Sequence, residues 1–208
     1  MHVLKFCIKY FIFLFILTYT SSLVFAQNTP EILLQNIADN MIAGLKANKA
    51  TLKTKPTIVY NLAYRYVVPN ADLSEMSKRV LPPSVWNSAS PAQRKQFQRE
   101  FTTTIIRTYA SALTSYEDQT IKFYPIRGNY NNAHTIEVSS EIISSNRHPV
   151  HVVYRLVRTA SGWKLFDMSL EGVSMLDSFR TQFADLLSQG SMNQLLAQMA
   201  RHNNRTLE

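Results

Sequence analysis

Residues 150–168 read VHVVYRLVRTASGWKLFDM, and this stretch decides the fold. Apolar side chains recur at every second position in both of its halves: Val150, Val152, Tyr154 and Leu156, then Trp163 and Leu165. A period of two is typical of a β-strand. Ser161-Gly162 stands between the halves and has the turn chemistry of an antiparallel hairpin. The stretch therefore predicts two paired strands.

The same two strands carry apolar side chains on their second face as well. These additional side chains are Val153, Val157, Phe166 and Met168. An antiparallel strand with one face in water shows only one apolar face. This part of the sheet must therefore be covered on both sides, or it must line an apolar space.

Toward the N-terminus the same period continues and then changes. Two further strands are predicted around Ile121–Pro125 and Ile136–Ile142, with turns at Gly128-Asn129 and Ser145-Asn146. Before Asp118 the apolar residues follow the helical period of about 3.6. The pattern predicts an α+β fold, a twisted antiparallel sheet of about four strands wrapped by several helices.

The helices flank the sheet on both sides in the sequence. The spacing predicts helices over residues 30–49, from Pro56 to Pro69, over 72–80, from Ser90 to Tyr116, over 175–187 and around 192–199. Ser90 and Gln93 have the spacing of a capping box, with Pro91 at the first helical position. Pro82-Pro83 is expected to end the third helix.

Residues 1–26 have the pattern of a secretory signal peptide. Lys5 and Lys9 precede an apolar run, and small residues lead up to Ala26, after which we expect cleavage. Residues 27–208 then form a single domain, since no repeat or linker divides them. An uncleaved membrane anchor is the alternative, but the run falls short of the roughly 20 residues that span a bilayer. The only cysteine, Cys7, lies in the leader.

The chain carries a net charge of +8, but its basic residues are dispersed. No long basic run and no nucleic-acid-binding spacing is present, so nucleic acid is not an expected partner. A solvated basic surface explains the charge, and attraction to anionic lipid headgroups or to an acidic protein remains the alternative.

Catalytic and metal-binding patterns find no support in the sequence. His148 and His151 are three residues apart, which on a strand points them to opposite faces. Ser174 lacks the glycine pattern of a nucleophile elbow and is expected to cap the following helix. Asp167 and Glu171 are expected to cap helices or form ion pairs. We therefore expect no catalytic residue, no metal and no cofactor.

Residues 163–176, WKLFDMSLEGVSML, with FRTQF at 179–183, resemble the signature of the MlaC family, and Asp167-Met168 with Glu171-Gly172-Val173-Ser174 is its specific part. The segment SPAQRKQF at 90–97, with Phe101 and Tyr109, resembles a helix of the same family. One departure lies at Leu81-Pro82-Pro83-Ser84-Val85-Trp86, which replaces the Leu-Gly that members often have there.

The resemblance implies a soluble, non-enzymatic, periplasmic carrier of diacyl phospholipid that maintains outer-membrane lipid asymmetry. Its implied partners are an outer-membrane lipoprotein complex and an inner-membrane ABC transporter complex with a membrane-anchored substrate-binding subunit. We expect a monomer with an apolar lipid cavity between sheet and helices. The predicted lipid-binding residues are Phe101, Ile105, Tyr109, Val153, Phe166, Met168, Val173 and Met175.

Three alternatives remain open from the residues alone. In the first, the predicted lipid-binding residues form an ordinary core. In the second, the chain is a small-molecule enzyme on a cone-like α+β scaffold, with Asp167 or Glu171 as base. In the third, it is a periplasmic chaperone or adaptor, which would present an exposed apolar groove in place of a closed cavity.

Overall fold

A computed structural model describes residues 29–145 and 147–205, so the predicted leader lies outside the described residues. The helices and strands follow in the order α2 (Pro30–Ala47), η1 (Lys49–Thr51), α3 (Thr57–Leu62), η2 (Ala63–Val67), η3 (Val68–Asn70), α4 (Leu73–Val80), α5 (Pro83–Ser88), α6 (Pro91–Thr114), β1 (Thr120–Phe123), β2 (Thr135–Ser144), β3 (Arg147–Thr159), β4 (Gly162–Leu170), β5 (Val173–Ser174), α7 (Met175–Ser188) and α8 (Met192–Asn203).

The strands form one antiparallel sheet in the order β1-β2-β3-β4-β5, so each strand pairs with its neighbour in the sequence. The α+β prediction is confirmed, with a fifth strand of two residues that its length hid from the pattern. At the β3–β4 turn Gly162 has a φ of +108°, a conformation that other residues rarely adopt.

An irregularity in β4 decides which side chains share a face of the sheet. Arg155 pairs with Asp167 but Leu156 pairs with Leu165, which leaves Phe166 as an extra residue in a bulge. Beyond the bulge Val153 pairs with Ser169, whereas Met168 pairs with Tyr154. Paired residues point to the same face and successive residues to opposite faces. The expectation that Val153 and Met168 share one face is therefore wrong.

The predicted helices are present, and one helix was missed. Ser90 Oγ accepts from Gln93 N–H at 3.2 Å while Gln93 Oε1 accepts from Ser90 N–H at 2.8 Å, which confirms the capping box of α6. Pro83 does not only follow the end of α4, as expected, but also occupies the first turn of α5. A proline fits that position because its missing N–H has no helical partner there.

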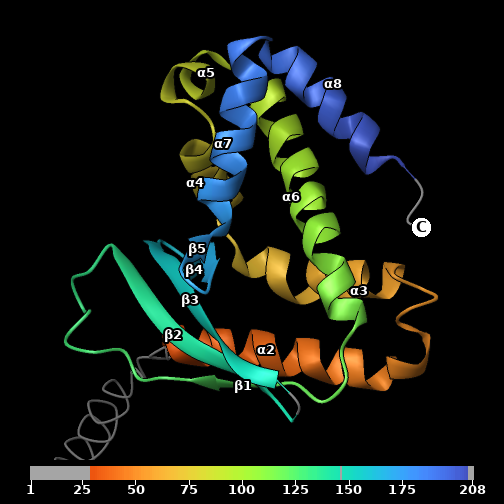
Figure 1. The fold of residues 1–208 in the computed structure, drawn as a ribbon. Helices are drawn as coiled ribbons and strands as arrows, with labels where there is room; N and C mark the ends of the chain where they lie inside the picture. The colour runs from red at the N-terminus through yellow and green to blue at the C-terminus, as the bar shows by residue number, and fades with distance from the viewer. Residues whose placement is uncertain (1–28, 146, 206–208) are drawn as a thin grey trace, which may run out of the picture.

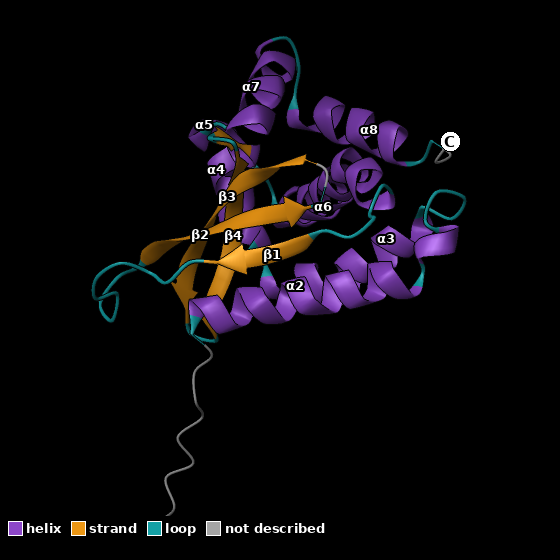
Figure 2. Ribbon diagram, turned by 60° about the horizontal axis from the view of Figure 1, so that its bottom comes forward, coloured by secondary structure: helices purple, strands orange, loops and turns teal. Residues whose placement is uncertain are grey.

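Most of the helices gather above the sheet, while α2 lies along β1 and α3 lies beside α2 (Figure 1; Figure 2). Most of the buried apolar residues belong to one of three cores. The helical core contains residues from the five helices α4, α5, α6, α7 and α8 and from one side of β4. Its residues include Val80, Trp86, Phe97, Phe101, Phe166, Met175, Leu176, Phe179, Phe183 and Leu195. The sheet core consists of Leu34, Ile136, Val138, Leu156 and Trp163. The α2–α3 core consists of Leu45, Leu52, Val59 and Ala110.

Candidate functional site

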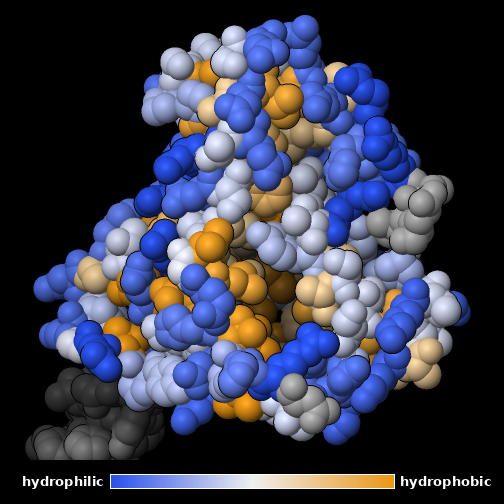
Figure 3. All heavy atoms as spheres, viewed as in Figure 1, coloured by the Kyte–Doolittle hydropathy of each residue, from blue (hydrophilic) through white to orange (hydrophobic). Residues whose placement is uncertain are grey.

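A hollow edged by apolar side chains opens between the sheet and the helices α3 and α6 (Figure 3). The surrounding helices chiefly contact one another: α6 packs against α3, α4 and α8, and α2 packs against β1, α3 and η2. The sheet in turn contacts α4 and α7 through β4. The hollow thus lies between the sheet and helices that pack chiefly against one another.

One face of the sheet carries the sheet core and, apart from it, further apolar side chains that belong to no core. The register places these residues on a single face, where all are half-buried and none belongs to the three cores of the described chain: Ile121, Ile142, Val150, Met168 and Leu170. We call them the half-buried sheet patch. Each Å² of apolar surface that stays in contact with water loses roughly 25 cal/mol of the stabilisation that burial would give. A patch of this kind favours an apolar ligand as its missing cover.

Burial raises the pKa of two tyrosines, one on β3 and one on α6. Tyr154 lies on the same face as Met168, its partner in β4, and burial raises the pKa of its hydroxyl above the ordinary 10.0. Tyr109 on α6 has its pKa raised by burial and, to a lesser degree, by the negative charge of Asp167. Tyr109 packs against the helical core.

Five of the eight predicted lipid-binding residues meet in or beside the helical core. Phe101 is 2 % exposed, Phe166 and Met175 are buried with it, and Ile105 and Tyr109 are half-buried against the same core. Phe101 also contacts three other phenylalanine rings, with centroids 5.3 to 5.6 Å away. These contacts are those of a packed core, and a role in lipid binding stays a prediction.

The other three predicted residues lie apart from that group and from one another. Met168 belongs to the half-buried sheet patch, while Val153 is half-buried on the opposite face. Val173 is 64 % exposed in β5. Four patch residues were not predicted from the sequence. Val150 alternates with Tyr154 within β3, and that was the available signal, whereas Ile121, Ile142 and Leu170 join this face only through the register of the neighbouring strands.

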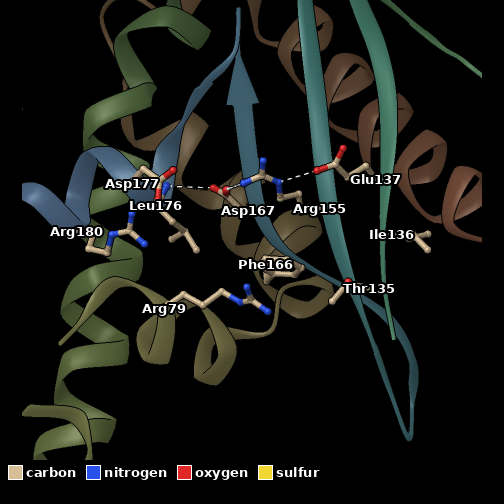
Figure 4. Close-up of a pocket in the computed structure, with 10 residues that line it drawn as sticks. All are labelled: Arg79, Thr135, Ile136, Glu137, Arg155, Phe166, Asp167, Leu176, Asp177 and Arg180. Carbon is tan, nitrogen blue, oxygen red and sulfur yellow. Dashed lines mark hydrogen bonds and ion pairs between the residues drawn. The ribbon is translucent and has the colours of Figure 1, made fainter. Parts of the chain in front are cut away.

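Asp167 holds the start of α7 against the sheet (Figure 4). It is 2 % exposed, and its carboxylate accepts hydrogen bonds from Arg155 Nη1 at 3.1 Å, Ser174 Oγ at 2.7 Å and Leu176 N–H at 3.1 Å. Arg155 also pairs with Glu137, whose hydrogen bond is the main cause that raises the pKa of the guanidinium. A carboxylate that binds three donors is held in place as an acceptor, which explains this signature residue without catalysis.

The carboxylate network borders a pocket of about 670 Å³ that Arg79, Phe166 and Arg180 also line. Asp167 and Phe166 enter it from the side of the sheet that carries Arg155, opposite to the half-buried sheet patch. The second signature carboxylate, Glu171, is exposed, and its side chain accepts from the His151 N–H. It thereby completes the hydrogen bonding at the end of β4.

Within residues 29–145 and 147–205, no group of three or more His, Cys, Asp or Glu side chains is placed to hold a metal ion. None of the helices in this part of the chain combines the length and the apolar character needed to cross a membrane.

Comparisons with known proteins place this geometry among lipid-binding proteins. The family model described as MlaC protein matches residues 35–201. The toluene tolerance protein Ttg2D of Pseudomonas putida is 27 % identical over 165 residues, which cover 79 % of this chain and 76 % of that protein. The intermembrane phospholipid transport system binding protein MlaC of Haemophilus influenzae is 28 % identical over 177 residues, 84 % and 82 % of the two chains.

A solved structure extends the similarity to three dimensions. The phospholipid-binding protein of Ralstonia solanacearum, determined in complex with a phospholipid, superposes with a TM-score of 0.75 at 27 % identity. The alignment covers 82 % of this chain and 94 % of that one.

Proposed function

The chain belongs to the MlaC family, and from this membership we propose that it is a periplasmic phospholipid-binding protein whose hollow holds the acyl chains of the lipid. The observation that carries the proposal is the half-buried sheet patch, taken together with the hollow between the sheet and the helices. It supplies apolar surface that the protein's own cores leave uncovered, on the side of the sheet that faces away from the Asp167 network. The phospholipid complex of a relative with the same fold supports this choice of ligand.

The energetics of lipid in water explain why such a hollow is needed. Each methylene moved from water into an apolar site is worth about 0.8 kcal/mol, so one long acyl chain amounts to on the order of ten kcal/mol. A free phospholipid therefore rarely leaves a membrane unaided. A protein that covers the chains and leaves the headgroup in water lowers that cost, and it needs no dedicated phosphate site.

As a carrier, the protein would exchange lipid with complexes in both membranes. We include in the proposal an outer-membrane lipoprotein complex and an inner-membrane ABC transporter complex with an anchored substrate-binding subunit. The support is family membership together with the description of the H. influenzae relative as part of an intermembrane phospholipid transport system.

Native mass spectrometry of the purified mature protein tests lipid binding directly. The wild type is expected to carry phospholipid, and Met168→Asp and Val150→Asp are expected to lose it, because both place a charge on the half-buried sheet patch. Leu186→Asp is the matched control, since Leu186 is 37 % exposed near the far end of α7. A wild type without lipid would overturn the proposal.

Circular dichroism keeps this test independent of folding. Both patch variants are expected to unfold with a transition close to that of the control, because their side chains lie outside the three cores. Folded patch variants that keep their lipid would show that the acyl chains lie elsewhere.

In the enzyme alternative, Asp167 or Glu171 would act as the base, but both carboxylates have structural roles. Asp167 binds three donors that fix α7, and Glu171 binds the backbone of β3. The matched relatives described by ligand are phospholipid-binding or transport proteins. These observations favour a carrier over a catalyst.

A further inference from the structure

A basic pocket of about 490 Å³ lies where α4, α5 and α6 meet. Its wall is made of Ser74 and Lys78 from α4, Trp86 from α5, and Pro91, Arg94, Lys95 and Gln98 from α6. Three of these side chains are cationic, and among the residues that the structure describes no acidic side chain lines it. The pocket therefore has one sign of charge.

The floor of this pocket is rigid. Arg94 donates from Nε to the Trp86 carbonyl and from Nη2 to the Asn87 carbonyl, both at 3.0 Å, and its guanidinium lies 5.0 Å from the centre of the Trp86 ring. The Trp86 side chain is itself buried in the helical core. Both acceptors are neutral carbonyls, so the positive charge of Arg94 remains available to a ligand.

The two lysines at the rim approach from different helices. Lys78 and Lys95 are exposed, and neither takes part in the four ion pairs found among residues 29–145 and 147–205. The neighbouring Arg79 differs, because it pairs with Glu75 at 2.7 Å. The positive charges in the pocket repel one another, and an anionic group bound between them would replace this repulsion with attraction.

We propose that this pocket docks an acidic segment of a partner protein. Three cationic side chains from two helices lie within this one small pocket, and the closely spaced carboxylates of an acidic segment complement that charge. Tryptophan and arginine are also the residue types enriched at the energetic centres of protein interfaces. The pocket uses Trp86 from the Leu81–Trp86 segment that departs from the family pattern, so we expect the partner's docking segment to match this chain in particular.

The docking pocket is separate from the proposed lipid site. Its residues come from α4, α5 and α6, and none of them belongs to the half-buried sheet patch. Partner docking and lipid retention are therefore expected to fail independently of one another.

Fluorescence of Trp86 provides the test. In a Trp163→Phe protein, Trp86 is the only tryptophan, and N-acetylated hexaglutamate is titrated as the probe at low and at physiological salt. We expect saturable binding that weakens with salt and that falls at least about tenfold in Lys78→Glu/Lys95→Glu, because two charge pairs are reversed. Lys53→Glu/Lys55→Glu is the control, since it changes the net charge equally with two exposed lysines outside the pocket.

Three results would overturn the proposal. If hexaglutamate shows no saturable binding at low salt, the pocket does not bind an acidic ligand. If both double variants lose the same amount of affinity, the binding depends only on net charge. If binding of vesicles that contain phosphatidylglycerol requires Lys78 and Lys95 while binding of the peptide does not, the pocket would be assigned to a membrane surface. Phospholipid retention is expected to be unchanged in both double variants.

Discussion

Replacing Asp167 by asparagine is expected to lower the free energy of unfolding by about 1.5–3 kcal/mol, the worth of one hydrogen bond to a charged group. The side chain is almost the same size, so the change acts on bonding and leaves packing intact. The carboxylate accepts from Arg155, Ser174 and Leu176. An amide keeps one acceptor oxygen and turns a donor toward the others, so the ion pair with Arg155 is lost.

Two further variants set the scale of this prediction. Asp167→Ala is expected to cost about 3–5 kcal/mol, because it leaves two buried donors, the Ser174 hydroxyl and the Leu176 N–H, without their acceptor. Glu137→Gln is the matched control: Glu137 contacts the same guanidinium, but its side chain is 61 % exposed. We expect a loss of no more than about 1 kcal/mol there.

Urea unfolding of lipid-free protein at neutral pH, followed by circular dichroism, measures all three variants. The slope with denaturant should stay constant, so that the midpoints report stability. The reasoning fails if the asparagine variant is as stable as the wild type, or if Glu137→Gln costs as much as Asp167→Asn. Lipid bound to the folded asparagine variant would in addition separate the structural role of Asp167 from ligand binding.

Three other perturbations test the cores, the turn and the tyrosine environment. Phe101→Ala should cost about 3–5 kcal/mol in urea unfolding because it empties the centre of a phenylalanine cluster, and a loss below about 1 kcal/mol would place Phe101 in a loosely packed wall. Gly162→Ala should cost about 1–3 kcal/mol through its backbone alone, since φ is +108° and no atom within 4 Å would meet the added methyl, and an unchanged midpoint would contradict that conformation. Burial keeps Tyr154 protonated above the ordinary pKa of 10.0, so its contribution to stability is complete below that pH and is lost as the pH rises through the raised pKa of the folded protein. Tyr154→Phe should therefore flatten the alkaline fall of the unfolding midpoint, and identical curves for variant and wild type would refute it.

The elements that local chemistry determines were predictable from the sequence. Ser90, Pro91 and Gln93 specify the start of α6 by satisfying its first backbone donors, and no distant residue is required for that. The alternation from Val150 to Leu156 similarly predicted β3, because one covered face imposes a period of two. Pro83 shows the limit of such signals, since a proline suits both the end of one helix and the first turn of the next.

The composition of the candidate site depended on features that alternation does not carry. One extra residue at Phe166 turns Met168 to the other face of the sheet, and the sequence contains no mark of that bulge. Whether Ile142 is covered or left half-buried depends on where α2 and α6 come to lie, which is set by contacts between distant segments. The predicted residues on α6 consequently fell in the helical core, and most of the half-buried sheet patch was overlooked.

The division of the interior into three cores also bears on how the family can diversify. Two helices belong to more than one core: α2 places Leu34 in the sheet core and Leu45 in the α2–α3 core, and α6 places Phe101 in the helical core and Ala110 in the α2–α3 core. A core substitution that displaces α6 is therefore expected to affect two cores as well as the hollow that α6 borders. Divergence of the hollow within the family is then expected to require compensating substitutions in both cores.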